Sequence, residues 1–198
     1  MIDRAGMAST PTLTWLGVPG DEPAWTALGF DVDEGGFTIG RIRCGIGDTG
    51  WGFDEIHSDA SVLGVRTITS PVAAPAVHPC GVSAVDHVVY TVPNLDSAVA
   101  ALNAVLGSPP RRRFHPRGPQ GPEMALYRVG EAVIEVGASG GEPALIGLAL
   151  KSPDLDATVA QIRRCGGPVS DPKPAVQGGR IASVWSGHLH WGLAVMGA

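Results

Sequence analysis

The stretch VDHVVYTVPNLDSAV, residues 85–99, decides the fold because it predicts a buried β-strand that turns directly into a helix. Its first eight residues are mostly β-branched or aromatic, as strand residues are, and one imidazole, His87, interrupts them. Pro93 ends the strand because it has no N–H to donate to a ladder. Asn94 can then cap a helix whose first turn carries the negative charge of Asp96.

The same pattern recurs downstream in LALKSPDLDATV, residues 148–159. Pro93 aligns with Pro153, which gives an offset of 60 residues (153 − 93). A duplication that keeps one offset along a whole unit indicates a repeated structural element. Further pairs keep this offset without a gap: Leu95 with Leu155, Asp96 with Asp156, Val99 with Val159, Gly107 with Gly167, and Gly137 with Gly197.

The spacing predicts two β-α-β-β-β units, over residues 82–138 and 144–198. In the first unit we expect strand 85–92, helix 95–106, and strands 111–115, 124–129 and 132–137. In the second unit we expect strand 144–151, helix 155–164, and strands 169–176, 180–186 and 190–196.

Residues 1–70 predict a β-rich N-terminal extension, and the proline- and alanine-rich segment 71–81 predicts an extended linker. Within the extension we expect a helix over 22–28 and strands over 13–18, 30–32, 37–44 and 51–56. This order is that of the repeat in miniature, and it leaves open whether the extension is a degenerate third unit.

Composition narrows the class of function. A hydrophobic content of 44% with a mean hydropathy of +0.15 supports a real core, and the net charge of −5 argues against nonspecific nucleic-acid binding. No apolar run approaches the roughly 20 residues of a membrane span, and the N-terminus lacks an apolar signal core. The three cysteines are widely spaced and odd in number, which favours a reducing compartment. We therefore expect a cytoplasmic α+β protein with no nucleic-acid or membrane partner.

The paired units resemble the vicinal oxygen chelate superfamily, which includes the glyoxalase and bleomycin-resistance proteins. The resemblance covers residues 81–198, and its carriers are the opening VDHVV…VPNLD and the closing strand VIEV at 133–136. It implies that two βαβββ units curl into one open β-cup that holds a small-molecule ligand. It also implies that first and last strands of a unit are neighbours and supply metal ligands, and that a homodimer can complete the cup.

His87 and Glu135 match the two ligand positions that the resemblance implies, 48 residues apart (135 − 87). By the 60-residue offset they fall on Gly147 and Val195 in the second unit, neither of which ligates a metal. Three interpretations remain open. The pair binds a divalent ion such as Zn, Mn, Fe or Ni; or it forms a metal-free polar pair that can act in acid–base catalysis; or it is purely structural.

Four further residues are candidates for substrate binding. His115, on a strand that borders the cup, is the better third metal candidate. Arg111 and Arg113 could clamp an anion, although a solvated edge strand is the favoured interpretation of 111–113. Strand alternation places Arg111 and Arg113 on one face and Arg112 on the other. Trp191 could line the pocket.

Two functions of different class follow from the resemblance. One is a metal-assisted lyase, isomerase or dioxygenase acting on a small organic molecule, with His87 and Glu135 as catalytic residues. The alternative is a non-catalytic protein that sequesters or senses a ligand in the same cup. The second unit's missing ligands favour the binding protein, whereas the persistence of His87 with Glu135 favours the enzyme.

Overall fold

The larger of two β-sheets is built by the C-terminal part of the chain. The structure, a computed structural model, describes residues 10–176 and 178–197. The first unit comprises β6 (Ala84–Val92), α2 (Leu95–Leu106), β7 (Arg112–Phe114), β8 (Met124–Val129) and β9 (Ala132–Ala138). The second comprises β10 (Ala144–Lys151), α3 (Leu155–Arg164), β11 (Lys173–Pro174), β12 (Arg180–Val184), α4 (Ser186–Leu189) and β13 (Gly192–Gly197).

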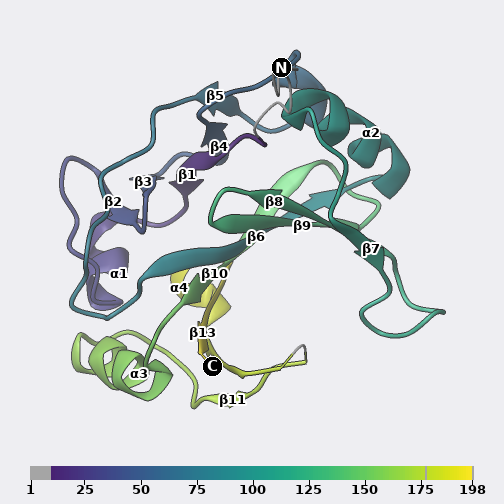
Figure 1. Cartoon of the computed structure of the whole chain (residues 1–198). Coiled ribbons are helices and arrows are strands. Elements are labelled where there is room, and N and C mark those ends of the chain that lie inside the picture. The colour runs from purple at the N-terminus through teal and green to yellow at the C-terminus, as the bar shows by residue number, and fades with distance from the viewer. Residues whose placement is uncertain (1–9, 177, 198) are drawn as a thin grey trace, which may run out of the picture.

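The eight strands of this sheet follow the order β11-β12-β13-β10-β6-β9-β8-β7. In each unit the first strand pairs in parallel with the last, β6 with β9 and β10 with β13, and the two first strands pair antiparallel at the centre. The sheet curls into an open cup (Figure 1). Two βαβββ units in an α+β cup are therefore confirmed.

Both unit helices begin and end where the sequence predicts. Asn94 accepts a hydrogen bond from the backbone N–H of Ser97, and Asp154 accepts the same bond from Ala157. These caps satisfy N–H groups that the first helical turn leaves free. Gly107 closes α2 with φ of 63°, a left-handed conformation that favours glycine.

The N-terminal part forms a second sheet of five strands, in the order β2-β3-β1-β4-β5. Its elements are β1 (Leu13–Val18), α1 (Glu22–Ala27), β2 (Gly36–Ile39), β3 (Ile42–Ile46), β4 (Gly50–Phe53), the 3₁₀ turn η1 (Ala60–Leu63) and β5 (Thr67–Thr69). The predicted strand over 37–44 is wrong, because the chain reverses at Gly40, whose φ is 58°. The predicted strand over 30–32 is also not formed.

The small sheet repeats the central five strands of the large one. From β2 to β5, successive pairs are antiparallel, parallel, antiparallel and parallel. From β8 through β9, β6 and β10 to β13 the sequence of pairings is the same. The extension therefore has the topology of two shortened units rather than one.

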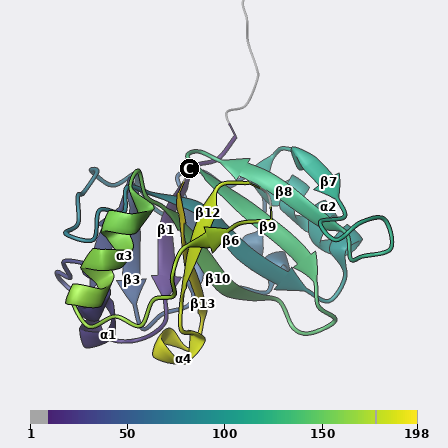
Figure 2. The same ribbon diagram turned by 90° about the horizontal axis from the view of Figure 1, so that it is seen from below.

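The small sheet packs on the convex side of the large one, and the two share one hydrophobic core (Figures 1 and 2). The Trp51 ring lies 4.9 Å from the Tyr90 ring, and the Tyr90 hydroxyl donates to the Leu63 carbonyl at 2.5 Å. Burial raises the pKa of Tyr90 to about 12. Residues 10–70 are therefore part of the same folded body as the cup. No helix in the described ranges is long and apolar enough to span a membrane.

The repeat slips by one residue before its last strand. Val88 lies opposite Ile134 and Leu148 lies opposite Leu193, so the offset is 60 for the first strands (148 − 88) but 59 for the last ones (193 − 134). The structural counterpart of Glu135 is consequently Ala194 and not Val195, which is buried in the core. Neither alanine nor valine ligates a metal, so the second unit has no metal ligand at the position equivalent to Glu135.

Candidate functional site

One face of the large sheet lines the cup, and strand alternation selects which side chains reach it. On β6 and β9 the core side takes Val88, Tyr90, Ile134 and Val136, all fully buried. His87 and Glu135 alternate with these residues and face the cup. Because His87 lies opposite Val133 and Glu135 lies opposite Val89, the two are diagonal neighbours on adjacent strands. Such a pair can reach one common ligand.

Both side chains line a single cavity of about 560 Å³ on this face. That volume lies within the range of small-molecule sites, roughly 300–1,000 Å³. The wall is mainly apolar, with few polar groups, which is also typical of such sites. The lining residues are Asp86, His87, Leu126, Val133, Glu135, Lys173, Pro174, Ala175, Val176, Gly178, Ile181, Ser183 and Met196.

His87 is held by its sequence neighbour. Its Nδ1 lies 2.7 Å from the Asp86 carboxylate, whose other oxygen lies 3.3 Å from the Lys151 ammonium. The hydrogen bond with His87, together with the nearby positive charges, holds the pKa of Asp86 below its usual value. Asp86 is therefore an ionised acceptor at neutral pH, so Nδ1 must carry the proton of the bond. In the neutral ring, that tautomer leaves Nε2 as an unprotonated acceptor.

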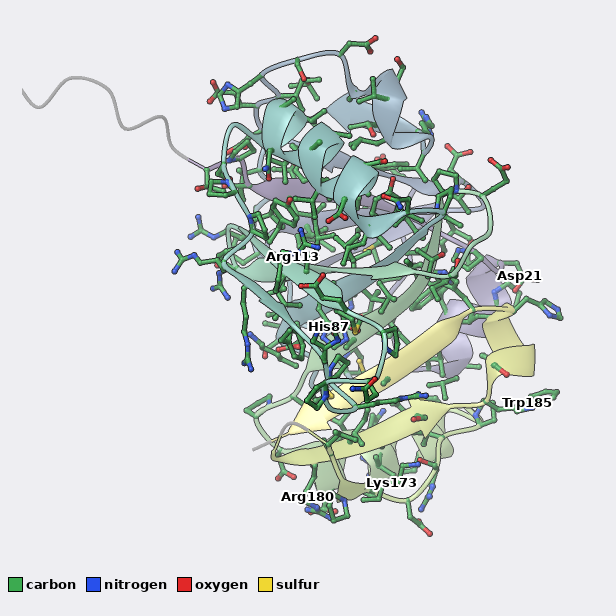
Figure 3. The ribbon with its side chains drawn as sticks, turned by 90° about the vertical axis from the view of Figure 1, so that its right-hand side faces the viewer. Asp21, His87, Arg113, Lys173, Arg180 and Trp185 are labelled. Atoms are coloured by element: carbon green, nitrogen blue, oxygen red, sulfur yellow. The ribbon has the colours of Figure 1, made fainter. Side chains whose placement is uncertain are left out.

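A β-bulge beside His87 explains how the side chains of Asp86 and His87, which are consecutive in the strand, can form a hydrogen bond. The pairing of β6 with β10 shifts between His87 and Val85, which lie opposite Ala149 and Leu150. A bulge breaks strict alternation and re-aims a side chain. Asp86 therefore lines the same cavity as His87 and can bond its ring. In Figure 3, His87 lies within the curve of the sheet.

Glu135 has no ion-pair or hydrogen-bond partner for its carboxylate among the described residues. It lies opposite Leu126 on β8 and Val89 on β6, both apolar, and its side chain is half-buried. A carboxylate in apolar surroundings without a partner is unfavourable unless it meets a ligand or water. The Glu135 carboxylate is therefore available to bind a ligand at the cup wall.

Whether the cup can hold a metal ion depends on its donor side chains. Among the described residues no group of three or more His, Cys, Asp or Glu side chains could hold one. A catalytic zinc ion usually keeps three protein ligands, whereas His87 and Glu135 supply two. Gly147 and Ala194, which stand at the corresponding positions of the second unit, supply none. The residues present therefore do not fit a resident ion bound by protein side chains alone.

The other candidate residues lie outside this cavity. The Nδ1 of His115 lies 2.8 Å from the Gly121 carbonyl, in an exposed loop. Trp191 is 8% exposed and donates to the Leu145 carbonyl at 2.9 Å, so it packs in the core. The structure thus brings His87 and Glu135 together, but not His115 or Trp191 with them.

Arg111 and Arg113 lie on opposite faces of the sheet. Arg113 binds Asp96 on α2 at 2.7 Å and Glu123 at 2.6 Å, on the side away from the cup (Figure 3). Arg111 lines a neighbouring cavity of about 390 Å³. The expectation that Arg111 and Arg113 share one face is wrong because Arg111 lies in the bend before β7, where alternation does not apply.

The second unit contains an ion pair equivalent to the one between Arg113 and Asp96. Arg180 on β12 binds Asp156 on α3 at 2.6 Å, and Asp156 is the repeat partner of Asp96. In both units the pair joins the first turn of the helix to the sheet, where an acidic residue also complements the helix dipole. The ion pair of Arg113 therefore has a structural role, as that of Arg180 does, because each attaches a helix to the sheet.

Sequence reasoning missed Asp86 and Lys173 as residues of the site. Asp86 stands beside His87 in the sequence, but regular alternation would place it on the opposite face, and no signal marks the bulge. Lys173 comes from a strand of two residues, too short for a periodic pattern. Only the assembled cup shows that both line its wall.

Comparison with solved structures gives several matches that each cover a little under three fifths of the chain. Methylmalonyl-CoA epimerase from Mycobacterium tuberculosis is 22% identical, with 59% of this chain and 89% of that chain covered and a TM-score of 0.49. A variant of the Streptomyces coelicolor methylmalonyl-CoA epimerase, in complex with 2-nitronate-propionyl-CoA, is 18% identical over 59% and 95%, with a TM-score of 0.48. A hypothetical protein from Bacillus halodurans is 14% identical over 58% and 93%, also with a TM-score of 0.48.

Comparison with protein families gives one match, to a range within the two units of the cup. The model described as Glyoxalase/Bleomycin resistance protein/Dioxygenase superfamily matches residues 86–183. The match begins at Asp86, on the first strand of the first unit, and ends at Ser183, on the third strand of the second. A comparison with curated proteins found no match.

Proposed function

Because the chain belongs to the glyoxalase/bleomycin resistance protein/dioxygenase superfamily, we propose that it is a small-molecule enzyme in which His87 moves a proton on a ligand bound in the cup. The observation that carries this proposal is the Asp86–His87 bond at 2.7 Å at the wall of the cavity. A carboxylate that fixes the tautomer of an imidazole and stabilises its charged form makes that imidazole a better proton acceptor.

His87 would act through Nε2, the ring nitrogen that Asp86 leaves open. The proton leaves a carbon beside a carbonyl of the ligand and moves to Nε2, the electron pair of the C–H bond forms a C=C bond, and the C=O π pair moves to the oxygen to give an enolate. The imidazolium that forms is stabilised by Asp86, and it returns the proton at the same or a neighbouring atom. This sequence is balanced without an oxidant and corresponds to an isomerase reaction.

Glu135 would be the second polar group of the reaction. As a diagonal neighbour of His87 across β6 and β9, it can reach the same ligand from another direction. An imidazole and a carboxylate in different surroundings can divide the roles of acid and base. We assign to Glu135 the transfer or acceptance of a proton at a second ligand atom.

The predicted divalent metal stays a prediction. His87 Nε2 and the Glu135 carboxylate could contribute two ligands to an ion only if ligand oxygens or water supplied the others. When bound, such an ion would polarise an oxygen of the ligand. The proton-transfer role of the Asp86–His87 pair does not require it.

A binding protein without catalysis is the second candidate, and the second unit favours it. Its positions equivalent to the polar or central cup positions of the first unit, Gly147, Ala149 and Ala194, carry no polar side chain, so these positions offer only apolar contact. Sequestration of a ligand needs this apolar wall but not the Asp86–His87 bond.

Proton exchange with solvent distinguishes the two candidates. The protein is incubated in D₂O with a panel of small ketones, oxo acids and thioesters that carry an acidic C–H, and NMR follows the loss of each proton signal. We expect catalysed exchange with at least one compound that also binds in the cup. Binding without exchange, or no interaction with any compound, would contradict the proposed enzyme, and binding alone would support the second candidate.

A further inference from the structure

Two rows of directly opposed strand residues cross the cup face, one starting at His87 and the other at Glu135, and each row ends at an arginine. In one row His87, Val133 and Arg128 lie directly opposite one another on β6, β9 and β8. In the next row Glu135, Leu126 and Arg112 lie opposite one another on β9, β8 and β7. Each row therefore separates a proton-transfer group from a guanidinium by one apolar residue.

The two cavities along these rows are neighbours that share two lining residues. The cavity of about 390 Å³ is lined by Arg111, Leu126, Arg128 and Val133, and the last three carry the rows just described. Leu126 and Val133 also line the cavity that holds His87 and Glu135. Two strand spacings separate Arg128 from His87, which is about 10 Å. A single extended molecule can therefore occupy both cavities.

The arginines at this end carry uncompensated charge. Within the described ranges, Arg111, Arg112 and Arg128 take part in no ion pair, although Arg43, Arg66, Arg113, Arg163 and Arg180 each have a carboxylate partner. Arg112 stacks over the Phe114 ring at 4.5 Å. Arg111 and Arg128 therefore bring two guanidinium groups to one cavity with no carboxylate partner among the described residues, on a protein whose net charge is −5.

Protection of a sheet edge is the alternative explanation of this cluster. β7 is the edge strand, and positive charge on it discourages pairing with another chain. Arg128 lies on β8 beyond the residues that pair with β7, so its own backbone pairs only with β9. Its position opposite Val133 places its side chain on the cup face, at the cavity that Arg111 also lines, and this shared cavity favours a binding role over edge protection alone.

We propose that the cavity at Arg111 and Arg128 is an anion subsite that binds a carboxylate or phosphate group of the ligand. Guanidinium groups match both oxyanions in geometry and charge. This proposal rests on the proposed function in one respect, that the rest of the same ligand reaches His87. The substrate would then be an organic anion with about 10 Å between its charged group and its reacting carbon.

The subsite can be tested with simple anions. The uniformly ¹⁵N-labelled protein is titrated with inorganic phosphate and, separately, with acetate, and amide shifts are followed by NMR. We expect saturable shifts at Arg111, Leu126, Arg128 and Val133 with at least one anion. Arg128→Gln should weaken that binding about tenfold, because a charge-assisted hydrogen bond is lost. Phosphate alone or acetate alone would identify the group that the subsite prefers.

Arg41→Gln is the matched control, because it removes the same charge from an exposed turn of the small sheet. It should leave anion binding unchanged. No saturable shift at the cavity, or equal weakening by both variants, would overturn the subsite. Anion binding without catalysed proton exchange would support the subsite and contradict the proposed function. Catalysed proton exchange without anion binding would support the proposed function and contradict the subsite.

Discussion

Replacing His87 by glutamine is expected to lower the rate of catalysed proton exchange by about 10²–10⁴-fold, the usual contribution of a positioned general base. Glutamine keeps a polar side chain at the cup wall but has no basic nitrogen. Ligand binding should change much less, since most of the cavity wall is apolar and stays in place. The rate of proton loss in D₂O and the dissociation constant of the same compound measure the two effects separately.

His115→Gln is the control for this prediction. It makes the same chemical change in the exposed loop, outside the cavity. Asp86→Asn should give an intermediate loss, because it removes the charge beside His87 but not the side-chain oxygen. A His87→Gln rate within threefold of wild type, with the melting temperature preserved, would show that His87 is not the base.

Trp51→Ala is expected to destabilise the whole protein by about 3–5 kcal/mol, the typical cost of truncating a buried tryptophan. The Trp51 side chain is fully buried between the two sheets, against Tyr90. Its indole N–H also donates to the Thr67 hydroxyl at 2.8 Å. Because one core joins the sheets, both should unfold in a single transition. Urea unfolding followed by far-ultraviolet circular dichroism measures the free energy.

Trp185→Ala provides the comparison, since Trp185 is 68% exposed. That variant should stay within about 0.5 kcal/mol of wild type, as surface substitutions usually do. A Trp51→Ala transition that splits in two, with the large sheet retaining its original stability, would mean that residues 10–70 fold independently of the cup.

The fold could be predicted because its decisive signals are local and repeated. Pro93 and Pro153 end the first strands, and Asn94 and Asp154 begin the helices that follow. The same offset appears in both units, so each supports the other. The small sheet was harder to predict, since its short strands and the turn at Gly40 leave little periodicity.

The slip to an offset of 59 shows why positions in the last strand could not be transferred by counting. One residue fewer between helix and last strand is easily accommodated in a loop, but it moves every later side chain to the other face. Val195 thereby faces the core, and Ala194 takes the place that Glu135 has in the first unit.

The site could be predicted in part. His87 and Glu135 were recognisable as polar residues in apolar strands, and the structure places both at one cavity. Their role as metal ligands or catalytic residues stays a prediction. Asp86 could not be assigned to the cup because the bulge on β6 depends on pairing with β10, which lies about 60 residues away. Long-range pairing of this kind leaves no mark in the local sequence.

The tautomer of His87 is the most direct test of the central claim, that Asp86 holds this ring with Nε2 open to the cup. Ring ¹⁵N shifts and one-bond couplings are measured by NMR above about pH 8, where an ordinary histidine is neutral. Signals absent from the His87→Gln spectrum identify the ring. A protonated Nδ1 with an unprotonated Nε2 is the result expected from the 2.7 Å bond to Asp86. A protonated Nε2 would contradict the account, since the nitrogen facing the ligand could then accept no proton.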